Sequence, residues 1–341
     1  MRLKTLACSL LLCPSTPVLA QSAAPAVAAE TPSANSRPIR DEAPVVVTGA
    51  MPGPGMWKVS KDDHVLYVLG TLSPLPRRME WVSRDVRNVL AEADEVLMGY
   101  GAVVDADVGF FGRLALIPSM LGARKNPDGA ELKDLVPEET YARWLVLKHR
   151  YLGRDRDVEQ WRPVFAATHL YEEAIEDGGL VRSGIVGPVI EDAIKQHKIK
   201  RTEPHVKIKI KEPKAALKEF RAESLSDLDC FNKTLQNLEA DLARMTERAN
   251  AWAIGDIETL RSLPLGDQYQ TCIRALTQGA VARKYGLGKL EAETRQAWLS
   301  AAEAAIANNR VSLATLPMSE LLKPDGFLTS LQAKGYTVEA P

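Results

Sequence analysis

Apolar and polar residues alternate near both ends of the chain, whereas between the ends apolar residues mostly recur every three or four positions. At the N-terminal side, this pattern predicts a strand around Trp57 and Val59, a polar turn, and a second strand over 64–69. A helix over about 83–93 and a strand over 95–98 follow. Strand, helix and strand in this order are typical of a βαβ unit.

The middle of the chain is predicted to be mostly helical. A helical stretch over 134–152 opens with acidic residues, which the helix dipole favours in the first turn. Pro163 suits the first turn of another helix, which runs to about residue 176. His149 and His169 fall in these two helices, and we interpret both as packed or solvated, as lone helical histidines usually are.

The clearest helix is predicted over 226–254, where apolar residues are spaced alternately three and four apart. This heptad spacing gives one apolar seam about 43 Å long at 1.5 Å per residue. The seam either packs against the protein's own helices, which we favour, or joins two copies into a homo-oligomer through a coiled coil. Its residues are Leu228, Phe231, Leu235, Leu238, Leu242, Met245, Ala249 and Trp252.

The C-terminal region predicts a second βαβ-like unit. A helix over 292–307, a strand over 311–316, a helix over 327–333 and a final strand over 336–339 follow one another. Predicted strands therefore cluster at both ends of the chain. The predicted fold class is α/β, with a mixed sheet formed by the N- and C-terminal segments and a large helical middle.

Residues 1–20 have the features of a secretory signal peptide. Arg2 and Lys4 precede a short apolar run, and Val18 and Ala20 occupy the −3 and −1 positions of a cleavage site. The run is too short to span a bilayer, which takes about 20 residues. We therefore predict export to the periplasm.

Residues 21–50 are rich in Ala, Pro and Ser and have no apolar period. This composition predicts a disordered linker, which leaves 56–341 as the folded domain. The full chain has 341 residues, of which 26% are charged, and a formal net charge of −1. Such a balance gives no general attraction to nucleic acid, and no transmembrane segment is predicted.

Cleavage after residue 20 would remove two of the four cysteines and leave Cys230 and Cys272. An even pair in an exported chain is expected to form one disulfide. If bonded, the pair would join the helix over 226–254 to a later helix. The alternative is two buried free thiols.

A basic segment covers about 195–218, and within it apolar residues and lysines alternate strictly over Val206–Lys211. The alternation predicts a strand with one apolar face and one lysine face. The lysines suit either a polyanion site or an edge strand whose charges prevent edge-to-edge pairing, and we favour the edge strand.

Six segments span nearly all of the chain after Met56: WKVS at 57–60, VLGT at 68–71, ADEVL at 93–97, AWAIGD at 251–256, DGFL at 325–328 and LQAKGYTVE at 331–339. In their order and spacing they resemble the TraB/GumN family. The resemblance implies the fold of that family and a site built from two Gly-x-x-His motifs and a glutamate at the end of an early strand. Two imidazoles and a carboxylate can hold a divalent metal and leave a position for water, which implies metal-assisted hydrolysis. Animal relatives in the wider group are regarded as metal-dependent proteases.

This sequence departs from the family pattern at each of the three side chains. Ser73 stands in place of the first histidine, Gly99 in place of the glutamate, and Glu320 in place of the second histidine. Ser73 and Glu320, even with help from Asp94 or Glu95, make a poor transition-metal site, because a neutral hydroxyl is a weak ligand.

A serine nucleophile does not replace the lost chemistry. Ser73 lacks the Gly-x-Ser-x-Gly turn, and Pro74 directly after it has no backbone N–H for an oxyanion hole. We therefore predict no catalytic residue and no cofactor.

The leading hypothesis is an exported, non-catalytic binding or scaffolding module with an unknown ligand. The alternative is a metal-dependent hydrolase that holds a divalent metal with Glu320 and other acids.

Overall fold

The computed structural model describes residues 53–240, 242–263 and 268–341. The predicted signal peptide over 1–20 and the predicted linker over 21–50 lie outside these residues. Within the described ranges, no helix combines the length and the apolar character that crossing a membrane requires.

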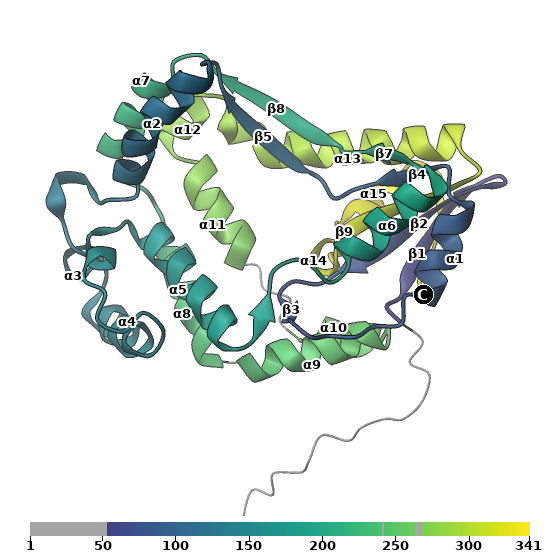
Figure 1. Ribbon diagram of the computed structural model, residues 1–341, viewed down its shortest axis with the longest axis horizontal. Helices are drawn as coiled ribbons and strands as arrows, with labels where there is room; N and C mark the ends of the chain where they lie inside the picture. The colour runs from purple at the N-terminus through teal and green to yellow at the C-terminus, as the bar shows by residue number, and fades with distance from the viewer. Residues whose placement is uncertain (1–52, 241, 264–267) are drawn as a thin grey trace, which may run out of the picture. The chain divides into compact units, whose positions relative to one another are not determined.

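The main sheet takes five of its six strands from the two end regions of the chain, as the alternating patterns predicted (Figure 1). Its strands are β1 (Met56–Lys61), β2 (His64–Thr71), β4 (Glu95–Leu97), β7 (Lys200–Thr202), β9 (Val311–Pro317) and β10 (Thr337–Glu339). They lie in the order β10-β1-β2-β9-β4-β7, with β1 antiparallel to both of its neighbours and the other pairs parallel. The predicted α/β fold with a mixed sheet is therefore confirmed.

The C-terminal strand β9 lies between the two strands of the first predicted βαβ unit, β2 and β4. It pairs with β2 over 65–71 and with β4 over 95–97, both in parallel. Because β2, β9, β4 and β7 run in the same direction, their carboxyl ends lie along one edge of the sheet. Segments about 240 residues apart in sequence therefore meet at that edge, as the pairing of Thr71 with Pro317 shows.

Helices cover the sheet and complete the first hydrophobic core. They are α1 (Arg84–Glu92), α6 (Gly187–His197), α13 (Leu290–Asn308), α14 (Met318–Leu321) and α15 (Phe327–Ala333). In α1, Val86 and Leu90 are one turn apart and buried, so the helix presents one apolar face to β9 and α6. The longest of these helices, α13, packs along β2, β9 and β4.

The helical middle forms a second core of its own. It contains α3 (Leu132–Leu135), α4 (Glu138–Tyr151), α5 (Pro163–Asp177) and α8 (Leu228–Ala240). The rings of Trp144 and Phe231 meet there with centroids 5.3 Å apart. His149 is exposed and His169 packs beside the ring of Trp161, so both histidines are solvated or packed as predicted.

The stretch predicted as one helix over 226–254 is described as two helices. These are α8 and α9 (Leu242–Ala253), on either side of residue 241, which lies outside the described residues. The seam is buried by the protein itself, but in different places: Phe231 belongs to the second core, whereas Trp252 belongs to the core of the sheet. The prediction that this seam packs within the protein is therefore confirmed for its described residues from Phe231 onward, and its two halves pack against different partners.

Smaller elements connect the sheet to the second core. They are β3 (Leu75–Pro76), β6 (Leu180–Val181), α10 (Ile257–Ser262), α11 (Gln268–Thr277) and α12 (Ala280–Lys284). A disulfide joins Cys230 in α8 to Cys272 in α11, with Cα atoms 4.7 Å apart. The predicted pairing of the two cysteines is present, and it ties two helices together.

The predicted lysine strand belongs to a separate two-stranded sheet. This sheet consists of β5 (Gly101–Ala106) and β8 (His205–Ile210), and it leads into α2 (Phe110–Ala123) and α7 (Pro213–Ala222), which pack together. Along β8, Ile208 is buried while Lys207 and Lys209 are exposed. Each strand of a two-stranded sheet is an edge, so β8 is an edge strand as predicted, and the role of its lysines stays a prediction.

Helix α2 exposes large apolar side chains to an unusual degree. Phe110 and Phe111 are 71% and 82% exposed, and Leu114, Ile117, Met120 and Leu121 are each about half exposed. Contiguous apolar surface of this kind is uncommon on soluble proteins.

Candidate functional site

The three positions identified from the sequence lie along the carboxyl edge of the parallel strands. Ser73 follows β2, Gly99 follows β4, and Glu320 follows β9 in α14. Because β9 pairs with both other strands, all three positions belong to adjacent strand ends. Ligands of open parallel sheets commonly bind at this edge.

The glycine of the first motif lies directly under the side chain of Met318. A Cβ on Gly70 would lie 2.5 Å from the Met318 methyl group, so a larger residue there would displace this buried side chain. The carbonyl of Gly70 accepts a hydrogen bond of 2.7 Å from the indole Nε1 of Trp252, which is fully buried. The loop that carries Ser73 therefore starts from a position fixed by α9.

The carboxylate of Glu320 is buried but already occupied. It accepts a hydrogen bond of 2.5 Å from the ammonium of Lys323, one helical turn onward. Tyr100, next to Gly99, is close enough to sense this carboxylate: burial, followed by the negative charges of Glu320 and Glu291, raises the pKa of its phenol. The strand ends after β4 and β9 therefore do converge, with Glu320 turned towards Lys323.

Gly99 supplies no ligand atom, although its surroundings leave room for a side chain. The nearest atom to a Cβ placed there would be Oγ1 of Thr315, at 3.9 Å. The absence of a carboxylate at this position is therefore a feature of the sequence and is not imposed by crowding.

Asp94 and Glu95 do not reach this edge, since they lie at the opposite end of β4. Glu95 is buried and accepts hydrogen bonds from Thr202 at 2.5 Å and from Asn309 at 2.8 Å, with the Lys200 ammonium 3.1 Å away. Burial alone would raise the pKa of Glu95, but these three partners together hold it below its ordinary value. Glu95 thus joins β4, β7 and the start of β9 and is not a partner for Glu320.

We expect the Glu95→Gln substitution to lower the free energy of unfolding by about 1–3 kcal/mol at neutral pH, because hydrogen bonds to a charged group are lost. The pKa of Glu95 is depressed in the folded state, so its stabilisation is present above the ordinary value of 4.5 and is lost as the pH falls below it. Urea unfolding of both proteins from about pH 7 to about pH 3 measures this. The difference in unfolding free energy between wild type and Glu95→Gln should become smaller as the pH falls. A difference that stays constant would contradict the stabilising role of the Glu95 carboxylate. The control is Glu92→Gln, at an exposed site.

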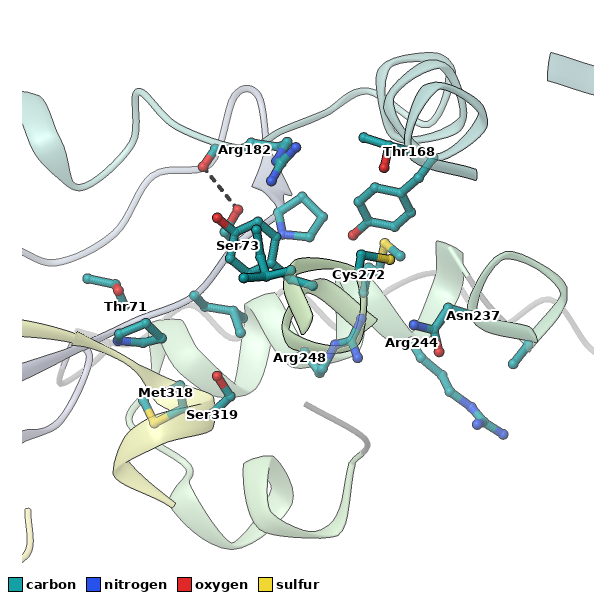
Figure 2. A pocket seen from close by; sticks show the side chains of 18 of the residues that line it. Thr71, Ser73, Thr168, Arg182, Asn237, Arg244, Arg248, Cys272, Met318 and Ser319 are labelled. Carbon is teal, nitrogen blue, oxygen red and sulfur yellow. Dashed lines mark hydrogen bonds between the residues drawn. The ribbon is translucent and has the colours of Figure 1, made fainter. Parts of the chain in front are cut away.

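A cavity of about 440 Å³ opens at the same edge of the sheet. One part of its wall consists of the loops after β2 and β9, including Ser73 and Ser319, and the other consists of α5, α8, α9 and α11. In the view of Figure 2, Thr71, Met318 and Ser319 lie on one side and Thr168, Asn237 and Arg244 on the other. The hydroxyl of Ser73 donates to the carbonyl oxygen of Arg182 at 3.0 Å, and this bond links the loop after β2 to the segment after β6 (Figure 2).

Three arginines are the charged residues among the described lining of this cavity. Arg182, Arg244 and Arg248 line the cavity, whereas none of its described lining residues is Asp, Glu or His. Burial raises the pKa of Tyr171, and the positive charges of Arg248 and Arg182 oppose that rise, which places both guanidinium groups near its phenol. Glu320 does not line the cavity.

The residues present do not fit the divalent metal that the family resemblance implies. Metal sites of this class use histidine and carboxylate ligands, whereas the described residues of the cavity wall offer hydroxyls and guanidinium groups. Over the residues whose placement is described, no three His, Cys, Asp or Glu side chains gather in a way that would hold a metal ion.

The arginines and Tyr171 are the site residues that sequence reasoning missed. They come from the helical middle, far from the strand ends in sequence, so no short motif connects them to Ser73 or Glu320. One signal was available: Arg244 and Arg248 are four residues apart, which places them on one face of a helix.

Comparisons with known proteins give one match. Residues 55–340 match the model of the TraB/PrgY/gumN family. The comparison with solved structures and the comparison with curated proteins each gave no match. Since the family model spans most of the chain, including every strand of the main sheet, the chain belongs to the TraB/PrgY/gumN family.

Proposed function

We propose that this protein is an exported, periplasmic, non-catalytic member of its family that binds a ligand in the cavity at the carboxyl edge of the sheet. One observation carries the proposal. The cavity lies against the two loops that replace the family's histidine motifs, and its described wall has arginines and hydroxyls where a metal site needs imidazoles and carboxylates.

The structure around the lost site supports a binding role. Ser73 and Ser319 line the cavity, so the family's motif loops still shape its wall. The hydroxyl of Ser73 is engaged with the Arg182 backbone, and the Glu320 carboxylate with Lys323. At the positions of the lost histidines, Ser73 therefore contributes to the cavity wall and Glu320 pairs within the segment that contains α14. This supports a cavity that binds a ligand without a metal.

The alternative function, a metal-dependent hydrolase, rests on one specific observation. Glu320 is buried at the position of the family's second histidine, and carboxylates do bind divalent metals. For metal to bind there, the carboxylate would have to exchange Lys323 for the ion.

We expect purified wild-type protein to contain no stoichiometric zinc, manganese or cobalt after incubation with each salt and removal of the excess. Plasma mass spectrometry of the protein measures the content. The matched variants are Glu320→Ala and Glu339→Ala, the latter removing an exposed carboxylate that pairs with Lys58. Stoichiometric metal in wild type and in Glu339→Ala, absent from Glu320→Ala, would overturn the non-catalytic proposal in favour of the hydrolase.

A further inference from the structure

We propose that helix α2, together with the exposed basic residues of α7 beside it, is a docking surface for a lipid bilayer with anionic head groups. This surface shares no residue with the described lining of the cavity, so the inference stands apart from the proposed function. It follows from the outward face of α2, the charges of the neighbouring helix and the length of α2.

The outward face of α2 is apolar, which reverses the usual arrangement of a surface helix. Such a helix normally buries its apolar stripe and exposes polar side chains. Helix α2 packs against α7 and buries Leu116 and Ala123, yet its exposed side is apolar as well (Figure 1). The exposed apolar residues recur mostly every three or four positions, so they share one broad face. They are Phe110, Phe111, Leu114, Ile117, Met120 and Leu121.

Positive charge borders this face on the side of α7. Lys214, Lys218 and Arg221 are four and three residues apart and exposed, so they share one face of that helix. A Cβ placed on Gly122 of α2 would lie 3.3 Å from the guanidinium carbon of Arg221, which puts this charge directly against the end of α2. Over the part of the chain that the structure describes, none of these three side chains has an ion-pair partner.

The acidic residues of the same region are fewer, and two of them are paired. Asp105 pairs with Arg113 at 2.9 Å, and Glu219 pairs with Lys284 on α12 at 2.7 Å. The remaining charged residues over 101–123 and 205–222 are Asp107, Lys207, Lys209, Lys211, Glu212, Lys214, Lys218 and Arg221. The local charge is therefore positive, although the net charge of the whole chain is −1.

An anionic bilayer satisfies both features of this surface at once. Its acyl region accepts exposed Phe and Leu side chains, and its head groups attract Lys and Arg beside them, as for helices that lie in the membrane interface. The only polar side chains of α2 are those of Arg113 and Ser119. With 14 residues, α2 is about 21 Å long and shorter than the hydrocarbon core of about 30 Å, so it suits the interface and not a span.

A second copy of the chain fits the surface less well. In a twofold dimer the same patch of both subunits meets, so the basic residues of α7 from both copies would come to one interface. Like charges that face each other across an interface cost free energy. The charge pattern therefore favours lipid over a second copy.

The test is flotation of the purified wild-type protein with phosphatidylcholine vesicles that contain or lack phosphatidylglycerol. We expect the partition coefficient to be at least about tenfold higher on the anionic vesicles and to fall as the salt concentration rises, because each basic residue near the surface adds to the attraction. Binding to neither vesicle would overturn the proposal. Equal binding to both would overturn the choice of an anionic bilayer.

A first pair of matched variants locates the apolar contact. Phe110→Ser combined with Phe111→Ser removes two mostly exposed rings and should weaken binding to the anionic vesicles at least about tenfold. The control, Leu145→Ser combined with Val146→Ser, removes exposed apolar side chains from α4 and should bind like wild type. Loss of binding in the control, with full binding in the α2 variant, would place the contact on α4 and overturn the proposal.

A second pair of variants locates the charge. Lys214→Gln combined with Lys218→Gln should weaken binding about fivefold per charge removed. The control, Lys195→Gln combined with Arg310→Gln, makes the same change of net charge at exposed sites in α6 and directly before β9. Equal losses in both double variants would mean that only the total charge matters, which would overturn the role of α7.

Sedimentation velocity without lipid tests the other occupant. We expect wild type and the double Phe→Ser variant of α2 to have the same molecular mass. A dimer that this variant converts to a monomer would assign α2 to a second copy and overturn the lipid assignment. None of these results bears on the metal content of the protein, which tests the proposed function separately.

Discussion

Replacing Trp252 with alanine is expected to lower the free energy of unfolding by about 3–5 kcal/mol, among the largest effects of any single substitution in this chain. Trp252 is fully buried in the core of the sheet, and its ring lies 5.5 Å from that of Trp81. Its indole N–H is also the donor to the Gly70 carbonyl. The substitution would therefore create a large cavity and leave a buried carbonyl without its partner.

The Trp252→Phe variant separates these two contributions. Phenylalanine keeps most of the apolar contact but removes the hydrogen bond, so we expect a loss of about 1–3 kcal/mol. Equilibrium unfolding in urea measures both variants against wild type. If Trp252→Phe is as stable as wild type, the bond to Gly70 does not hold the loop after β2, and the account of how that loop is fixed is wrong.

Removing the disulfide is the second large change. A closed loop with a sequence separation of 42 residues corresponds to about 4 kcal/mol in the chain-entropy model. Cys230 and Cys272 are both buried, so the double Cys→Ala variant adds a smaller loss from packing. We expect the free energy of unfolding to fall by about 4 kcal/mol, measured in urea under non-reducing conditions.

The disulfide also affects the cavity, because Cys272 lies in its wall and α11 carries three other lining residues. Non-reducing peptide mapping of exported protein should show Cys230 joined to Cys272. Free thiols at both positions, or unchanged stability of the double variant, would contradict the structural role assigned to the bond.

Local patterns predicted the individual strands of the sheet better than the order in which these strands lie. The alternation around Trp57 and Val59 identified β1, because a half-buried strand has an apolar residue at every second position. The short apolar run over 311–316 identified β9, because a strand buried on both faces has such a run. The insertion of β9 between β2 and β4 could not be predicted in this way. It depends on pairing between segments far apart in sequence, and no local period reports such pairing.

The stretch over 226–254 shows how much a correct apolar period can indicate. The spacing of apolar residues correctly identified the buried faces of α8 and α9. It could not indicate that Phe231 packs with Trp144 in one core while Trp252 packs with Trp81 in another. An apolar seam in the sequence identifies which side chains are buried. The tertiary structure decides which other residues they pack against.

The candidate site was predictable at its strand ends and not beyond them. Ser73, Gly99 and Glu320 were identified because they occupy motif positions, and the parallel strands bring these positions to one edge. The arginines that define the electrostatics of the cavity belong to no motif. Their role appears only when α9 and the segment after β6 are placed against the loops after β2 and β9.

The most direct test of the central claim is a pair of calorimetric titrations with zinc chloride, one into the wild-type protein and one into Glu320→Ala. The account predicts no saturable heat from zinc in either protein. Stoichiometric zinc binding to the wild type that Glu320→Ala abolishes would contradict it.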